Sequence, residues 1–220
     1  MNNKQQTTNN EQQTTNGEQR NCPRVGITGG IGSGKTTVCQ IFESLGIPVY
    51  YADEWAKWLI NNDAAVKKGI LEIFGPQAYT PEGAYNRAFV AKIVFTDKEK
   101  LTALNALVHP AVERHSRAWH HEQVLLDVPY TLKEAALMVE SGSHKFLDYL
   151  IVVSAPEALR IQRVMQRDGA TEEQVRVRMK SQMPEAEKVK LADFVIVNDG
   201  GQMLIPQVWQ IHQKILAKQI

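Results

Sequence analysis

The residues best suited to chemistry form one glycine-rich stretch, residues 29–36, with the sequence GGIGSGKT. It fits the phosphate-binding pattern G-x-x-x-x-G-K-[ST] in full. Its glycines let the backbone wrap a polyphosphate with the N–H groups pointing inward, and the following helix N-terminus adds positive field there. Lys35 can reach the β- and γ-phosphates, and the Thr36 hydroxyl can hold Mg²⁺. The predicted nucleotide-binding residues here are Gly32, Ser33, Gly34, Lys35, Thr36 and Thr37.

A carboxylate, Asp53, follows the second predicted strand, residues 47–51. In a parallel sheet, ligands bind beyond the carboxyl ends of the strands, where the glycine-rich stretch also begins. A carboxylate beside a bound phosphate can accept the proton of an attacking hydroxyl, or hold a metal through water. We therefore predict a catalytic role for Asp53. A compatible alternative is that it caps the helix starting at Glu54.

Three arginines, Arg160, Arg163 and Arg167, follow the fourth predicted strand at spacings of three and four, which places them on one helix face. Phosphoryl transfer spreads negative charge over the transferred oxygens, and an arginine that closes over them stabilises it. A solvated, salt-bridged face is the alternative. Next to a phosphate loop, we predict that at least one arginine binds phosphate. The predicted catalytic residues are Lys35, Asp53, Arg163 and Arg167.

Strand-like and helical segments alternate along the chain, which predicts an α/β fold with a parallel five-stranded sheet between helical layers, as in P-loop NTPases. The expected strands are residues 24–28, 47–51, 130–136, 149–154 and 194–198. The first helix should cover residues 37–45. A C-terminal helix should bury Leu204, Val208, Ile211 and Ile215, and leave His212 at the surface or the boundary.

Two helical regions interrupt this alternation. Residues 54–126 lack a strand-like run and predict a helical insertion between strands two and three. Within it, His109-Pro110 predicts a helix stop, because proline cannot continue a helix. Residues 156–190 predict a helical lid, with a capping box at residues 171–174. Residues 124–127 (VLLD) have the form of a second metal-binding signature, although the run is short and Pro129 follows.

Composition sets the class of protein. The 220 residues suit one domain, residues 22–220, and the net charge of +1 indicates neither nucleic acid nor a membrane surface as a partner. The leader, residues 1–21, is rich in Asn, Gln and Thr, which predicts disorder. Two cysteines without metal spacing favour a reducing cytoplasm. We expect a monomer or a small homo-oligomer.

From residue 24 to 199 the chain resembles the dephospho-coenzyme A kinases, which phosphorylate the ribose 3′-hydroxyl of dephospho-CoA with ATP. The resemblance rests on motifs at residues 27–35 (ITGGIGSGK), 49–53 (VYYAD), 83, 86–87, 104–110 (LNALVHP), 137–141 (LMVES), 163, 167–169, 182, 192–193 and 195–198 (VIVN). It implies a kinase core, a helical region that holds the CoA moiety, and a lid. It makes Asp53 the general base, with ATP as co-substrate and Mg²⁺ on Thr36.

The resemblance also assigns binding residues and exposes two departures. It implies that Asn198 binds nucleotide and that Asn86, Arg87, His109 and Glu134 bind substrate. Tyr51 stands where the family's Asp-Ala-Asp motif has its first Asp, which puts a two-carboxylate mechanism in doubt. Glu134 replaces the Asp of the family's Asp-x-Pro-Leu-Leu-x-Glu motif and becomes the candidate acidic group near Mg²⁺ or the substrate.

Other functions are compatible with a phosphate loop. Another P-loop kinase of small metabolites or nucleosides would keep the loop and the lid but change the helical insertion. A GTP-binding switch should carry Asn-Lys-x-Asp and Asp-x-x-Gly motifs, and the sequence contains neither. A non-catalytic ATP-binding module would have no need for a candidate base such as Asp53.

Overall fold

The computed structural model describes residues 22–218, so the predicted leader lies outside the described residues. Its centre is a five-stranded sheet in which every pairing is parallel and the strand order is β2-β3-β1-β4-β5. The strands are β1 (Arg24–Thr28), β2 (Val49–Tyr51), β3 (Thr131–Glu134), β4 (Tyr149–Ser154) and β5 (Phe194–Val197). The predicted P-loop NTPase-type fold is confirmed, with β2, β3 and β5 shorter than expected.

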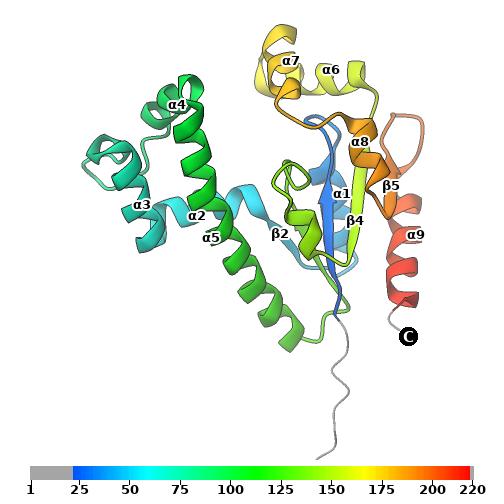
Figure 1. The fold of residues 1–220 in the computed structure, drawn as a ribbon. Helices are drawn as coiled ribbons and strands as arrows, with labels where there is room; N and C mark the ends of the chain where they lie inside the picture. The colour runs from blue at the N-terminus through cyan, green and yellow to red at the C-terminus, as the bar shows by residue number, and fades with distance from the viewer. Residues whose placement is uncertain (1–21, 219–220) are drawn as a thin grey trace, which may run out of the picture.

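Helices cover both faces of this sheet (Figure 1). On one face, α1 (Lys35–Ser44) and α9 (Leu204–Ala217) bury apolar side chains against the strands. The other face carries α8 (Glu185–Lys190) and the segment from β3 to η2 (Ser143–Phe146), which pack on Leu150 and Val152. The apolar, β-branched sequence of β4 predicts a buried strand, and β4 lies between β1 and β5 with its four middle residues buried.

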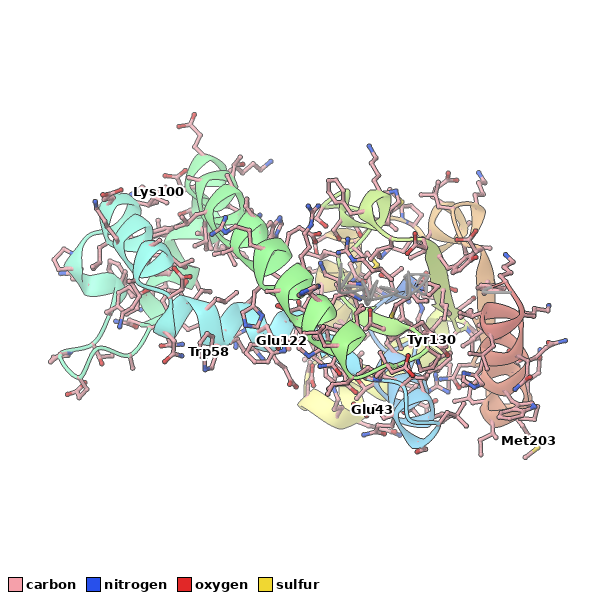
Figure 2. The ribbon with its side chains drawn as sticks, turned by 90° about the horizontal axis from the view of Figure 1, so that it is seen from below. Glu43, Trp58, Lys100, Glu122, Tyr130 and Met203 are labelled. Atoms are coloured by element: carbon pink, nitrogen blue, oxygen red, sulfur yellow. The ribbon has the colours of Figure 1, made fainter. Side chains whose placement is uncertain are left out.

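Between β2 and β3 the chain forms a helical arm that projects from the sheet (Figure 1). The arm consists of α2 (Ala52–Asn62), α3 (Ala64–Phe74), η1 (Pro76–Ala78), α4 (Arg87–Thr96) and α5 (Lys98–Leu125). It has its own apolar core, to which β2 contributes Tyr50. Figure 2 shows α5 running from the outer helices, near Lys100, to the sheet, near Glu122. This helix therefore connects the arm to the sheet.

A hairpin of α6 (Glu157–Asp168) and α7 (Glu172–Lys180) lies beyond the carboxyl ends of the strands (Figure 1). The predicted capping box is present, because Thr171 and Gln174 exchange hydrogen bonds at the start of α7. The hairpin's small apolar cluster reaches Ile31 in the glycine-rich loop. Among residues 22–218, no helix combines the length and the apolar character that a membrane crossing requires.

The predicted helix stop at His109-Pro110 is wrong, because α5 runs through both residues. Proline removes the hydrogen bond to the carbonyl four residues earlier, that of Ala106. Ala106 is exposed, so water can take this carbonyl. Val108, Ala111 and Val112 are buried on the other side of the helix. Tertiary packing thus outweighs the local penalty of the proline.

Two further expectations are also wrong. The run at residues 124–127 is no metal-binding strand: α5 ends at Leu125, and Asp127 lies before β3, at the sheet edge opposite the glycine-rich loop. His212 is buried, and its Nδ1 lies 2.8 Å from the Tyr130 hydroxyl. Its spacing from Val208 and Ile215 places it on the apolar face of α9, where the tyrosine satisfies the imidazole.

The buried strand β4 gives a direct test of this core. Ile151→Ala should lower the free energy of unfolding by about 2–5 kcal/mol, because Ile151 is fully buried and its truncation leaves a cavity. Val195→Ala on β5, where the valine is 38% exposed, is the matched control and should cost under about 1 kcal/mol. Urea unfolding followed by circular dichroism measures both. Equal losses would contradict the assignment of β4 to the core.

Candidate active site

The glycine-rich loop joins β1 to α1 and has the backbone its sequence predicts. Gly32 and Gly34 have φ angles of 79° and 93°, in the left-handed region that side chains disfavour. A Cβ on Gly32 would also collide with the backbone of Arg160. Gly34 is the N-cap of α1, whose first N–H groups lack intrahelical partners. The end of the loop thus presents the unpaired donors of a helix N-terminus, which are suited to phosphate.

Side chains from the far end of the sheet hold this loop by its carbonyls. Asn198 Nδ2, just after β5, donates to Ser33 O at 2.8 Å. Arg163 of α6 donates to Asn198 O at 3.2 Å and to Asn198 Oδ1 at 3.1 Å, and its Nη1 lies 3.5 Å from Gly32 O. These bonds use carbonyls of the loop, so they do not occupy the first N–H groups of α1. In this structure both residues therefore hold the loop in shape.

Lys35 is nearly buried between two oxygens. Its Nζ lies 3.1 Å from Gly29 O and 4.0 Å from Glu134 Oε1, and the side chains are 10% and 11% exposed. Burial lowers the pKa of Lys35 although the nearby Glu134 acts to raise it. Burial also raises the pKa of Glu134 to about 7, an effect that Lys35 opposes and Asp53 reinforces. The glycine-rich loop and the end of β3 thus share one electrostatic site.

Asp53 reaches the same edge from β2. Tyr51, which ends β2, pairs in register with Glu134 at the end of β3. The next helix, α2, begins at Ala52 with Tyr51 as its N-cap, so Asp53 lies inside the first turn and the capping alternative is wrong. Asp53 is exposed and lines a cleft of about 540 Å³ between the helical arm and the sheet. A carboxylate thus faces an open cleft beside the phosphate loop.

The cleft is apolar near α2 and charged at its floor. Leu104, Val108 and His109 of α5 line it opposite Ala56 and Ile60 of α2. The turn after β3 closes it with residues Ala135, Leu137, Ser141 and Ser143. His109, a predicted substrate residue, therefore lies in the same cleft as Asp53.

At the floor of the cleft, Glu113 is surrounded by cations. It accepts hydrogen bonds from Lys133 Nζ at 2.6 Å, Arg117 Nε at 2.8 Å and Arg24 Nη2 at 3.0 Å. Burial acts to raise the pKa of Glu113, but the hydrogen bonds from Lys133 and Arg117 outweigh it, and the pKa falls to about 2. Three cations around one carboxylate give the floor of the cleft a net positive charge, which favours an anionic ligand.

The other predicted substrate residues, Asn86 and Arg87, lie outside this cleft. Asn86 caps α4, accepting from Phe89 N at 3.2 Å and donating to Gln77 O at 3.2 Å. It lines a separate hollow at the outer end of the helical arm. Arg87 follows it and is exposed. The structure therefore gives Asn86 a capping role, and substrate binding by this pair stays a prediction.

The remaining arginines on α6 differ in their surroundings. Arg160 is buried above Gly30, with its Nε 3.4 Å from Glu185 Oε2. Arg167 is 64% exposed at the end of α6 and pairs with Asp168 at 2.7 Å. In this structure Arg167 therefore does not belong to the set that holds the loop, and its predicted catalytic role stays a prediction.

Sequence reasoning missed two charged residues near the site, Glu185 and Lys188. Glu185 Oε1 accepts from Ser154 Oγ at 2.6 Å, at the end of β4. Lys188 is fully buried and acts to lower the pKa of Lys35, so it lies within electrostatic range of the loop. Both sit on a six-residue helix with an ordinary mixture of charges. No pattern in that segment marks them, so only the fold reveals their position.

Comparisons with known proteins identify the family of this chain. A family model described as dephospho-CoA kinase (CoaE) matches residues 24–203. The chain is 37% identical over 196 residues to the dephospho-CoA kinase of Bacteroides fragilis, covering 87% of this chain and 94% of the relative. It is 40% identical over 204 residues to that of Chlorobaculum tepidum, covering 88% and 95%. The chain belongs to the dephospho-CoA kinase family.

Solved structures agree with this family. The crystal structure of TT1252 from Thermus thermophilus superposes with a TM-score of 0.75 at 36% identity, covering 90% of this chain and 97% of that one. The dephospho-CoA kinase from Campylobacter jejuni gives a TM-score of 0.64 at 28% identity, covering 90% and 98%. The chain is therefore a kinase, and the predicted family and enzyme class are confirmed.

The raised pKa of Glu134 predicts a pH-dependent stability. Folding raises it from about 4.3 in unfolded chains to about 7, so the folded state binds this proton more tightly. Its contribution to stability is therefore fully present below about pH 4 and lost as the pH rises through 7. The free energy of unfolding of the wild type, relative to that of Glu134→Gln, should fall by on the order of 1–3 kcal/mol between pH 5 and pH 8.

Urea unfolding of both proteins across this pH range measures the effect. Glu99→Gln is the control, because Glu99 is an exposed carboxylate in the first turn of α5 and is not among the groups that act on the pKa of Glu134. This variant should keep the wild-type pH dependence. Parallel stability curves for wild type and Glu134→Gln would show that Glu134 titrates normally.

Proposed function

We propose that this kinase transfers the γ-phosphoryl group of ATP to the ribose 3′-hydroxyl of dephospho-CoA, giving CoA and ADP. The observation that carries the proposal is the position of Asp53. It lies on the sheet edge that carries the phosphate loop, and it lines the cleft of about 540 Å³ beside that loop. A donor site and an acceptor cleft that meet at a carboxylate suit phosphoryl transfer to a hydroxyl. Family membership supports dephospho-CoA as the acceptor.

On the donor side, the N–H groups of the loop and Lys35 would hold the β- and γ-phosphates of ATP. Mg²⁺ would be held by the Thr36 hydroxyl and the phosphates, and would neutralise charge on them. The residues fit this ion, because the Thr36 side chain is exposed at the start of α1 and the Glu134 carboxylate lies 4.0 Å from Lys35 Nζ. Mg²⁺ typically binds one or two protein oxygens plus substrate phosphates.

On the acceptor side, the oxygen of the ribose 3′-hydroxyl attacks the γ-phosphorus while Asp53 accepts the proton of that hydroxyl, and ADP leaves. A positioned general base contributes about 10²–10⁴-fold to such a step. Glu134 lies beside Lys35, so we assign it to the phosphates, Mg²⁺ or the reacting ribose rather than to the distant part of the acceptor. The positively charged floor of the cleft around Glu113 suits the diphosphate of dephospho-CoA. His109 would contact the acceptor within the same cleft.

The hairpin of α6 and α7 is the proposed lid. Arg163 and Asn198 keep the loop in shape for nucleotide, and Arg167 would approach the transferring group when the hairpin closes. This closure would also exclude water from the transfer. A cytoplasmic location and a monomer or small homo-oligomer stay predictions from the sequence.

An acceptor panel tests this function. ATP consumption should rise with dephospho-CoA and stay at background with adenosine, AMP, gluconate and shikimate, because a single cleft shape and charge selects the acceptor. Product analysis should locate the new phosphate on the ribose 3′-oxygen. A response to adenosine or shikimate that equals or exceeds that to dephospho-CoA would favour the alternative, another small-metabolite kinase.

Asp53→Asn tests the base directly. It should cut turnover by about 10²–10⁴-fold while nucleotide affinity stays within about threefold, because the amide cannot take the proton but occupies the same space. Glu54→Gln, one residue further along α2, is the matched control and should keep turnover near the wild-type value. Near-normal turnover of Asp53→Asn would remove Asp53 from the mechanism.

A further inference from the structure

Lys188 is a buried charge that the proposed mechanism does not use. Its side chain is 0% exposed, and its Nζ lies 2.8 Å from Glu140 Oε1 and 3.3 Å from Ala136 O. Taking an ammonium out of water is costly unless good partners compensate it. The carboxylate and the carbonyl provide this compensation, so Lys188 can occupy its site only while Glu140 and Ala136 are in place.

Both partners of Lys188 belong to the turn that walls the acceptor cleft. The turn spans residues 135–143, and its residues Ala135, Leu137 and Ser141 line the cleft. The carbonyl of Ala136 also accepts from Thr28 Oγ1 at 3.4 Å, and Thr28 is the last residue of β1 before the glycine-rich loop. The ammonium thus binds at the point where the cleft wall meets the root of the loop.

The segment that carries Lys188, residues 182–188, joins the other side of the site. Gln182 Oε1 accepts from Ile31 N in the loop at 2.8 Å. Met183 N donates to Glu140 Oε1 at 2.8 Å, which gives this carboxylate a second bond to the same segment. Glu185 Oε2 lies 3.4 Å from Arg160 Nε on α6. This segment follows α7 closely in the chain, so a movement of the hairpin would stretch or shift the contacts that residues 182–188 make.

We propose that Lys188 is a positioning residue that couples the nucleotide site to the acceptor cleft. A bound nucleotide fixes the loop and the hairpin, and through residues 182–188 this order reaches Glu140 and Ala136 in the cleft wall. The ammonium is the strongest connection in this chain of contacts because it is charged, buried and bound to two points of the turn. The inference rests on the proposed function, since it requires both a nucleotide and an acceptor.

The test measures thermodynamic coupling between the two ligands. Calorimetry gives the Kd of dephospho-CoA with and without the β,γ-imido analogue of ATP and Mg²⁺. In the wild type the analogue should tighten acceptor binding about 5-fold or more, a typical size for coupled sites. In Lys188→Met, which keeps the chain length but removes the charge, this ratio should fall below about 2-fold.

A matched control separates coupling from general loosening of the fold. Tyr130→Phe also removes a buried hydrogen bond, the one to His212, on the face of the sheet away from the cleft. It should lower the thermal midpoint yet keep the wild-type ratio. If Lys188→Met does not fold, Glu140→Gln weakens the same contact from its other end and should also reduce the ratio.

Three results would overturn the inference. The first is a wild-type ratio near 1, and the second is an unchanged ratio in Lys188→Met. The third, where that variant does not fold, is an unchanged ratio in Glu140→Gln. Failure of the wild type to bind dephospho-CoA at all, with the ATP analogue still bound, would instead overturn the proposed acceptor, and the inference with it.

Discussion

The burial of Lys35 is the interaction on which the rest of the site depends. An ammonium with a side chain only 10% exposed needs compensating oxygens, and it has Gly29 O and Glu134 Oε1. Glu134 can provide one only because β3 lies next to β1, with Ile27 paired to Glu134 in parallel register. A slip of one residue would turn Glu134 to the other face of the sheet. The phosphate-binding lysine therefore requires the strand order as much as the loop sequence.

The two faces of the sheet have different roles, because one forms the packed core and the other forms the cleft. The face with α1 and α9 is a continuous apolar core, and it holds the strand ends and the loop in fixed positions. The opposite face is covered in two parts, by the helical arm and by the segment from residue 135 to α8, with the cleft between them. A rigid donor site beside a cleft with separately anchored walls suits a kinase, whose acceptor must enter and whose product must leave.

Much of this fold could be predicted from the sequence, and the exceptions have physical causes. The strands β1 and β4 were predictable because parallel strands buried on both faces read as apolar runs. The helix through Pro110 and the burial of His212 were not, because each depends on contacts with residues distant in the chain.

The same distinction holds within the site. The loop and the edge position of Asp53 follow from a local motif and from the geometry of parallel sheets. The contact of Arg163 with Asn198, 35 residues away, is a tertiary arrangement. So is the burial of Lys188 against Glu140, 48 positions earlier in the chain. Periodicity places a charged residue on a helix face, but it cannot say which distant group that face meets.

The replacement of a family aspartate by Tyr51 can be understood from the register of the sheet. Tyr51 pairs directly with Glu134, so both side chains leave the sheet on the same face. Burial raises the pKa of Tyr51, and nearby groups that include Glu43 and Glu134 add to this effect, which keeps its hydroxyl neutral. The family motif already has an acidic residue at position 134, so the change at position 51 removes one carboxylate from this edge and leaves the acidic position on β3 in place. The longer glutamate side chain reaches toward Lys35 from there, so the site keeps two acidic groups, Asp53 and Glu134, at the edge where phosphate would bind.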